Sequence, residues 1–381
     1  MRLSVVVVVY DMPNAAARTL RTLAADFQRG LRDDEYEVIV VDNGSQRPLP
    51  ADVVAAAPAN VRFCSLARPK PSPAAAANLG LSLARGRVVA LVLDGARLAT
   101  PRLLSLGVRA VESHPRAVVT TMGWLLGHTA PTDAINADDA AAADRTDAIL
   151  GTINWPSDPY RLFEVARLDG SMGWFGLGFE SSALFLPRAL WDELGGLDER
   201  FDEPGGGFVA LDLYARALEL PKCEPMLLLG EATIHQPHGG AATDRPPDDH
   251  VRRFMQWRDH YIALRGRDLP VQSPDLTYFG SLPTAWRVQF AAWILRQTLA
   301  EVPELAQVLA RMDAAVAADP TPQGSAWSEL YAVQAALLEL QRAAHTSDAD
   351  AWRRAYDATR ASWSWRLTAP LRHLARLLGF D

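Results

Sequence analysis

The fold is decided by LSVVVVVYD at residues 3–11 and VIVVDNGS at residues 38–45, each a run of β-branched residues that ends at polar ones. Continuous apolar runs of this length predict strands that are buried on both faces, as in parallel sheets. Helical patterns alternate with these strands, which predicts helices on both faces of one sheet. The further elements expected in this region are strands at 61–65 and 88–93 and helices at 15–30 and 74–85. The sequence therefore predicts an α/β fold with a Rossmann-like, mostly parallel sheet.

The composition is that of a folded protein with a large core, because 49% of the 381 residues are hydrophobic and 22% are charged. A formal net charge of −7 argues against a nucleic-acid partner, since phosphate backbones require a basic face. Cys64 and Cys223 have no metal-ligand spacing, so we expect no disulfide framework and a reducing compartment. The short apolar run before Asp11 is typical of a strand rather than of a signal peptide. Without a run of about 18 apolar residues, we expect no transmembrane helix and a cytoplasmic protein.

After about residue 283 the composition shifts to helix formers. We therefore predict an α/β domain at residues 1–265 and an all-helical C-terminal region at residues 266–381. Within the last segment, leucines recur at helical spacing, with arginines largely off their face and two tryptophans before it. These residues are Leu367, Leu371, Leu374 and Leu378, then Arg366, Arg372 and Arg376, then Trp363 and Trp365. The pattern is typical of a helix on a membrane surface, and equally of one that docks on this chain or on a second copy.

Polar side chains follow the predicted strands at the point where each strand ends. They are Tyr10 and Asp11, then Asp42 and Asn43, then Asp94. In open α/β sheets, ligands bind beyond the carboxyl ends of the strands, so these residues are candidate ligand contacts. Asp42 also starts Asp-Asn-Gly-Ser, which favours an Asx-type turn.

The motifs resemble family-2 glycosyltransferases of the GT-A fold over roughly residues 3–265. The resemblance is carried by VVVVVYDM at 5–12, VIVVDNGS at 38–45, AANLGLSLARG at 76–86, VALVLDG at 89–95, ELGGLDERF at 193–201 and LDLYAR at 211–216. Each motif is weak by itself, but their order and spacing together are specific. The resemblance implies a nucleotide-sugar donor. The carboxylate of Asp42 would accept the imide N–H of its uracil or thymine ring.

The resemblance also implies the other donor-binding positions. The full predicted set is Tyr10, Asp11, Asp42, Asn43, Lys70, Asn78, Asp94 and Arg97. Tyr10 and Asp11 correspond to the place where the family holds base and ribose. Lys70 would offset diphosphate charge, although loop lysines are usually solvated. Asn78 lies on the helix that faces the nucleotide in the family, or serves only to punctuate that helix.

A first departure from the family concerns the Asp-x-Asp motif, which reads Asp94-Gly95-Ala96 here. A hard cation thereby loses one oxygen ligand of the several that it prefers. His235 and His238 in IHQPHGG lie near the position of a cation-holding histidine in the family, so we predict a Mn²⁺ or Mg²⁺ site formed by them and Asp94. Arg97 would bind phosphate directly. The alternative is that the histidines are structural.

A second departure concerns the catalytic base, because an inverting transfer needs a carboxylate to take the acceptor proton. The family's Glu-Asp-x-Asp-Leu reads Val209-Ala210-Leu211-Asp212-Leu213 here. We predict Asp212 as the base and Glu180 as a second catalytic carboxylate, while Glu203 and Asp202 lie in the same segment and Glu203 is an alternative base. The alternative for Asp212 is a helix cap or a partner for Arg216.

The sequence thus predicts a glycosyltransferase of the hexosyltransferase type, which moves a sugar from a uridine or thymidine diphosphate donor. The expected acceptor is a glycan or a lipid-linked glycan in cell-surface polysaccharide synthesis, reached by a cytoplasmic protein at the inner membrane surface. A degenerate domain that binds nucleotide or glycan without transfer is the alternative. A nucleotidyltransferase ranks last, because the chain lacks the glycine-rich, basic first loop of such enzymes.

Overall fold

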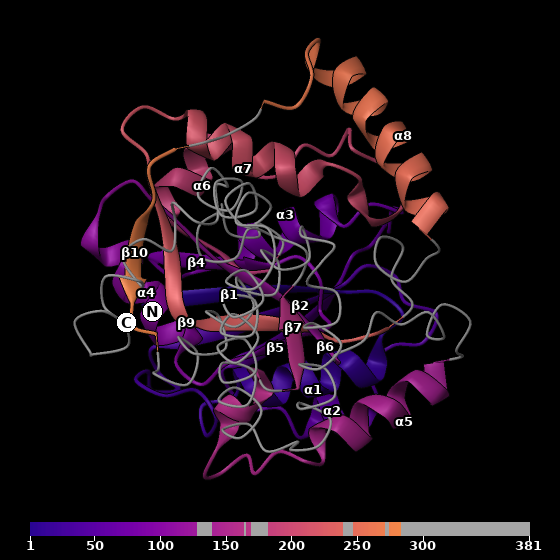
Figure 1. Cartoon of the computed structure of the whole chain (residues 1–381), viewed down its shortest axis with the longest axis vertical. Helices are drawn as coiled ribbons and strands as arrows, with labels where there is room; N and C mark the ends of the chain where they lie inside the picture. The colour runs from indigo at the N-terminus through magenta and orange to yellow at the C-terminus, as the bar shows by residue number, and fades with distance from the viewer. Residues whose placement is uncertain (128–138, 164, 169–181, 239–246, 271–273, 283–381) are drawn as a thin grey trace, which may run out of the picture. The chain divides into compact units, whose positions relative to one another are not determined.

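A computed structural model describes residues 1–127, 139–163, 165–168, 182–238, 247–270 and 274–282 (Figure 1). Two compact units divide the chain, Met1–Ser281 and Leu282–Asp381, and the described residues belong almost entirely to the first. The predicted helical C-terminal region and its leucine pattern lie outside the described residues. No helix of the described part is long and apolar enough to cross a membrane.

The described unit alternates strands and helices along most of its length. The strands are β1 Leu3–Val9, β2 Tyr36–Asp42, β3 Val61–Ser65, β4 Val88–Val92, β5 Arg97–Ala99, β6 Ala117–Leu126, β7 Ala166–Leu168, β8 Leu184–Pro187, β9 Glu224–His235 and β10 Thr277–Gly280. The helices are α1 Pro13–Leu23, α2 Ala51–Ala55, α3 Ala74–Leu83, α4 Leu103–Ser113, α5 Asp139–Leu150, α6 Arg188–Leu194, α7 Val209–Glu219 and α8 Pro247–Arg265. The predicted helix at 15–30 ends earlier, at Leu23, because Ala24 is extended.

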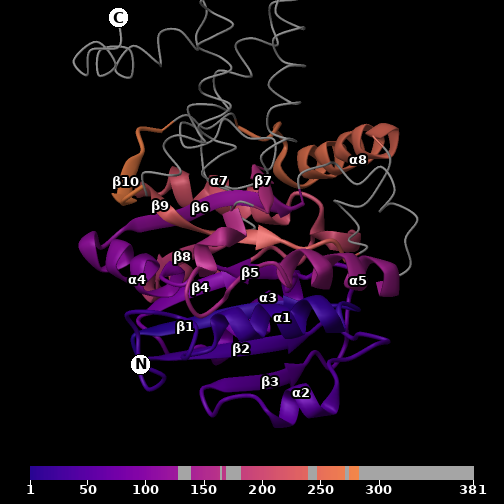
Figure 2. The same ribbon diagram turned by 60° about the horizontal axis from the view of Figure 1, so that its bottom comes forward.

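The strands form one mixed sheet in the order β10-β9-β6-β8-β4-β1-β2-β3, with β5 paired to β9 and β7 to β6. Figure 2 shows this succession from β3 at one edge to β10 at the other. β1 lies parallel to both β2 and β4, whereas β8 runs antiparallel to β4. The α/β architecture predicted from the sequence is therefore confirmed for the described unit.

The valine run of β1 forms the centre of the core, because the strand is buried on both faces. Val5, Val7 and Val9 pack into the cluster that also contains side chains of α1 and α4. Val6 and Val8 pack into the other cluster, with side chains of α3, α6 and α7. A central parallel strand must be apolar on both sides, which is why β1 shows no alternation of polar and apolar residues.

The parallel strands β1, β2 and β4 have their carboxyl ends at the same end of the sheet, which we call the strand-end edge. The polar residues singled out in the sequence follow the strands there. Gly95 follows β4 at this edge, in the interior position of the altered Asp-x-Asp motif. A Cβ there would lie 2.6 Å from Cγ1 of Val9 and 2.9 Å from the carbonyl oxygen of Val8. The close approach of the β1 backbone therefore requires glycine at this position.

Candidate active site

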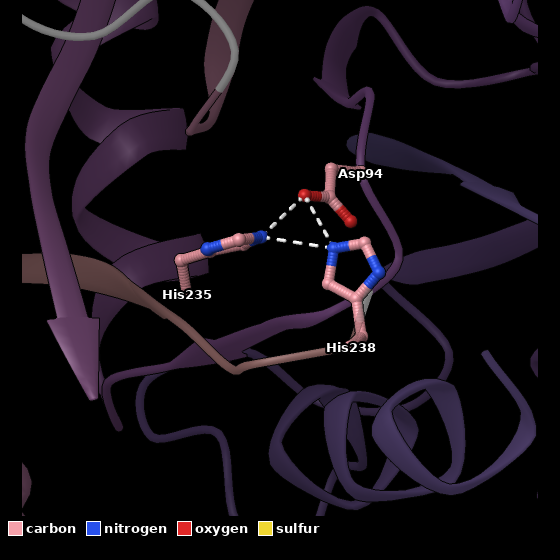
Figure 3. Close-up of side chains that lie close together, drawn as sticks. All are labelled: Asp94, His235 and His238. Carbon is pink, nitrogen blue, oxygen red and sulfur yellow. Dashed lines mark hydrogen bonds and ion pairs between the residues drawn. The ribbon is translucent and has the colours of Figure 1, made fainter. Parts of the chain in front are cut away.

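Three side chains from distant parts of the sequence converge beyond the end of β4 (Figure 3). Asp94 follows β4, His235 ends β9, and His238 lies three residues further on. Oδ2 of Asp94 lies 2.8 Å from Nε2 of His235 and 3.4 Å from Nε2 of His238, and the two imidazole nitrogens are 3.0 Å apart. Pairing of β5 with β9 brings these segments together, with Arg97 opposite His235.

The electrostatics of this cluster favour an anionic carboxylate beside a neutral imidazole. Burial lowers the pKa of His235, and the charge of Arg97 lowers it further, although Asp94 acts in the opposite direction. Burial alone would raise the pKa of Asp94, but His238 and His235 hold it well below its usual range. A neutral imidazole and a carboxylate are the protonation states that bind a metal ion.

The donor set of this cluster fits a divalent cation. Asp94, His235 and His238 each offer one ligand atom, and these atoms lie within 4.8 Å of one another. Oδ1 of Asp94 accepts the backbone N–H of Ala96 at 3.0 Å, which leaves Oδ2 directed at the histidines. Gln236 holds the intervening backbone, since its side-chain amide donates to the carbonyl oxygen of Ala15 at 3.0 Å. Two imidazoles and one carboxylate suit Mn²⁺ better than Mg²⁺, which prefers oxygen ligands.

Arg97 is a buried cation next to this cluster, with only 6% of its surface exposed. Its Nη1 donates to the hydroxyl of Ser182 at 3.3 Å, and its Nε has no hydrogen-bond partner among the described residues. No ion pair of Arg97 with a carboxylate occurs in the described part of the chain. A buried guanidinium without a counter-ion is suited to bind an anion such as phosphate.

The residues predicted to bind the nucleobase of the donor lie at the ends of β1 and β2. Tyr10 is half exposed, and Asp11 has a positive φ of 49° and accepts the backbone N–H of Arg47 at 2.8 Å. Oδ1 of Asp42 accepts the backbone N–H groups of Gly44 at 3.0 Å and Ser45 at 2.8 Å. The Asx-type turn anticipated at Asp42 is thus present. Oδ2 of Asp42 has no hydrogen bond among the described residues.

Asn43, Lys70 and Asn78 bind protein groups rather than facing the cluster around Asp94. The amide of Asn43 donates to the carbonyl oxygen of Lys70 at 2.8 Å. Nζ of Lys70 lies 3.0 Å from Oε2 of Glu199, and the amide of Asn78 donates to Oε1 of the same residue at 3.2 Å. Asn78 also exchanges two hydrogen bonds with the backbone of Leu197, so it anchors residues 195–197, the Gly-Gly segment, to α3.

Asp212 is fully buried and is held by two arginines. Nε of Arg216 lies 2.9 Å from its Oδ2, while Nε and Nη2 of Arg265 lie 2.6 and 2.7 Å from its two oxygens. This arrangement favours the structural role that the sequence left open for Asp212.

Glu180, the other predicted catalytic carboxylate, lies outside the described residues. Glu203 stays partly accessible in this region, with 27% of its side chain exposed and Oε1 placed 3.2 Å from Nδ1 of His260.

The sequence reading missed Arg265 and His260, which both lie on α8. Arg265 reaches Asp212 across 53 positions of sequence, and no local pattern announces such a contact. The aromatic spacing of Phe254, Trp257 and Tyr261 was a usable signal, since steps of three and four place side chains on one helix face.

Comparison with known proteins relates the N-terminal part of the chain to one family. Residues 4–126 match the model of glycosyl transferase family 2. Residues 4–126 carry β1 to β6, so this part of the chain, which includes Asp42, Asp94 and Arg97, is similar to family-2 glycosyltransferases. Comparison with curated proteins finds no match.

Among solved structures, the chain is similar to TarS of S. aureus. One TarS structure has 16% identity and a TM-score of 0.42 over 69% of this chain and 40% of that chain, so this chain spans less than half of that protein. TarS 1–349 in complex with UDP-GlcNAc has 16% identity and a TM-score of 0.41 over 69% of this chain and 67% of that chain. TarS 1–349 in complex with UDP has 14% identity and a TM-score of 0.38 over 90% and 92%. The match at residues 4–126 confirms the family resemblance for that part of the sequence.

Proposed function

We propose that the protein transfers a sugar from a uridine or thymidine diphosphate donor bound at the ends of β1, β2 and β4. The observation that carries this proposal is the convergence of Asp94, His235 and His238 at that edge, inside a chain whose residues 4–126 match the family model. Oδ2 of Asp42 remains available to accept the imide N–H of the base. Tyr10 and Asp11 lie at the adjacent strand end and would flank base and ribose.

Arg97 neutralises part of the diphosphate charge, and Asp94, His235 and His238 would hold a cation that neutralises the rest. Mn²⁺ is the cation that this donor set favours, with Mg²⁺ as the weaker choice. When bound, the cation stabilises the negative charge that develops on the leaving diphosphate. The buried guanidinium of Arg97 supports the same charge, because its Nε lacks a partner among the described residues.

Glu203 is the better candidate for the acceptor base than Asp212, whose oxygens are held by Arg216 and Arg265. In the step, the acceptor O–H gives its proton to a carboxylate oxygen of Glu203 while the acceptor oxygen bonds to the anomeric carbon. The bond from that carbon to the diphosphate oxygen breaks, and the nucleoside diphosphate leaves with the bonding electrons. Glu180 stays a second candidate for this role.

The test combines nucleotide binding with donor hydrolysis. Wild-type protein should bind UDP more tightly with Mn²⁺ by calorimetry, and His235→Ala should lose at least tenfold in Mn²⁺ affinity, as expected when a metal ligand is removed. Asp42→Ala should weaken UDP binding, whereas Val54→Ala, an exposed substitution on α2, should leave it unchanged. Absence of UDP and dTDP binding by the wild type would refute the proposed donor. Undiminished turnover in excess chelator would instead refute the cation and leave Arg97 to neutralise the diphosphate.

A domain that binds nucleotide without transfer is the second candidate. It is favoured by the absence of carboxylates at Val209 and Ala210 and by the two arginines that hold Asp212. Wild-type protein that binds UDP but releases no sugar from any hexosyl donor would support it. Donor hydrolysis that falls by a hundredfold or more in Glu203→Gln, a range typical for loss of a general base, would exclude it.

The proposed acceptor is a glycan or a lipid-linked glycan, and the proposed place of action is the cytoplasmic face of the inner membrane. Support comes only from the sequence pattern of residues 366–378, whose leucine stripe and arginines suit an anionic surface. Association of two copies through the same region is the competing use of that stripe. Co-sedimentation with anionic liposomes at low salt distinguishes the two, because the protein pellets with the liposomes only if the helix binds the membrane surface.

A further inference from the structure

The aromatic side chains of α8 form a continuous face above the start of α7. Phe254, Trp257 and Tyr261 are spaced by three and four residues, so they share one side of the helix. All three pack around Phe208, with ring centroids 5.1, 6.4 and 6.2 Å away. Phe208 and Tyr261 are buried, whereas 51% of Phe254 is exposed. The face therefore continues from the core to the surface at Phe254.

A carboxylate, an imidazole and a glycine border this aromatic face. Oε1 of Glu203 lies 3.2 Å from Nδ1 of His260, and His260 lies on α8 like the aromatic residues. Gly207 lies close to both Glu203 and Trp257, and its φ is +53°. A Cβ at this position would lie 3.1 Å from the Trp257 ring and 3.3 Å from Oε2 of Glu203. The Glu203 carboxylate and the Trp257 indole ring thus both border the space that a side chain at residue 207 would take.

Contacts connect this region to the proposed donor site. The backbone N–H of Gly205 donates to the carbonyl oxygen of Pro71 at 3.3 Å. The same loop is held at the end of β2, because the amide of Asn43 donates to the carbonyl oxygen of Lys70. The sequence also passes directly from His238 into α8 through residues 239–246. Figure 1 shows α8 on the side of the sheet that carries α6 and α7.

We propose that the surface formed by Phe254, Trp257, Glu203 and His260 binds a pyranose ring of the acceptor glycan. Aromatic faces offer apolar area to the C–H face of a sugar, while the carboxylate and the imidazole can bind its hydroxyls. Exposed aromatic area beside hydrogen-bonding groups suits a ligand that is apolar on one face and polar at its rim. The assignment rests on the proposed function and names the acceptor side of that site.

The experiment measures binding of full-length protein to a panel of immobilised oligosaccharides, without any donor nucleotide. Wild type should bind a subset of the panel, and Phe254→Ala and Trp257→Ala should each weaken that binding by roughly tenfold, or about 1.4 kcal/mol. Trp257→Phe should recover part of the loss, because it keeps an aromatic face. Val54→Ala, which truncates an exposed apolar side chain on α2, should bind like wild type. Melting temperatures establish that each variant is folded.

Phe254→Ala is the decisive variant, because half of its side chain is exposed and we expect its removal to cost less stability than that of a buried aromatic side chain. The proposal is overturned if wild type binds no glycan of the panel, or if folded Phe254→Ala and Trp257→Ala bind as tightly as wild type. UDP calorimetry on the wild type decides the donor site independently. Glycan binding that is lost in both variants supports the acceptor surface even if UDP fails to bind.

Discussion

Asp212, which the sequence predicts as the catalytic base, is a fully buried carboxylate that two arginines hold. Its oxygens accept from Arg216 on the same helix and from Arg265 at the end of α8, and Oδ2 of Asp198 lies 2.8 Å from Nη1 of Arg265. The two carboxylates raise the pKa of Arg265. The group therefore joins α7, α8 and the Gly-Gly segment, and removal of its charge should act on stability first.

Asp212→Asn should lower the free energy of unfolding by about 3 kcal/mol, because it leaves two partly buried guanidinium groups without their anion. Asp202→Asn, at an exposed position of the neighbouring segment, should change it little. Urea unfolding at neutral pH measures both. If Asp212→Asn keeps wild-type stability but loses donor turnover by more than a hundredfold, the residue is the base after all.

At the scale of elements, Glu37 couples β2 to β1 and to the turn before β4. Its Oε1 accepts the hydroxyl of Ser4 at 2.7 Å and the backbone N–H of Arg85 at 2.9 Å, and its Oε2 lies 2.7 Å from Nη2 of Arg62. Burial alone would raise the pKa of Glu37, but these donors and the two arginines lower it below its ordinary value. The carboxylate is 3% exposed, so little solvent screens the interaction.

A lowered pKa in the folded state gives a defined pH dependence. The stabilisation by Glu37 is complete above the pKa of the unfolded chain, about 4.3 for glutamate, and is lost as the pH falls through the lower folded-state pKa. Glu37→Gln should therefore be less stable than wild type near neutral pH, and its stability should fall less steeply below about pH 4.3. Denaturant unfolding as a function of pH measures both slopes. Parallel slopes for wild type and Glu37→Gln, with the exposed Asp33→Asn as control, would contradict the assignment.

For the whole molecule, what the sequence could predict depended on how local the signal was. The valine runs of β1 and β2 are local, so the sheet and its helices followed from them. The site at Asp94 was anticipated through a motif, whereas its geometry depends on the pairing of β5 with β9, which joins distant segments. The contact of Arg265 with Asp212 is of the same kind, since it depends on where α8 packs. Long-range pairing was therefore the missing information at both places.

The extent of the sheet raises a question about the domain boundary predicted at residue 265. β10 lies beyond that residue and pairs in parallel with the apolar segment Met226–Leu229 of β9, and Phe279 packs against the core. Arg258 on α8 also pairs with Asp268. A boundary after Ser281 would keep these contacts within the unit Met1–Ser281.

Comparison of fragments 1–281 and 1–265 tests this boundary. Fragment 1–265 loses β10, so the backbone groups of an apolar strand become a free edge, which favours association with other chains. We expect fragment 1–281 to be monomeric in size-exclusion chromatography and to unfold cooperatively in urea. Fragment 1–265 should elute as larger species and unfold at a lower urea concentration. If the shorter fragment equals the longer one in both measurements, β10 adds nothing to the domain and the boundary predicted at residue 265 holds. If neither fragment folds, the described unit depends on residues 282–381.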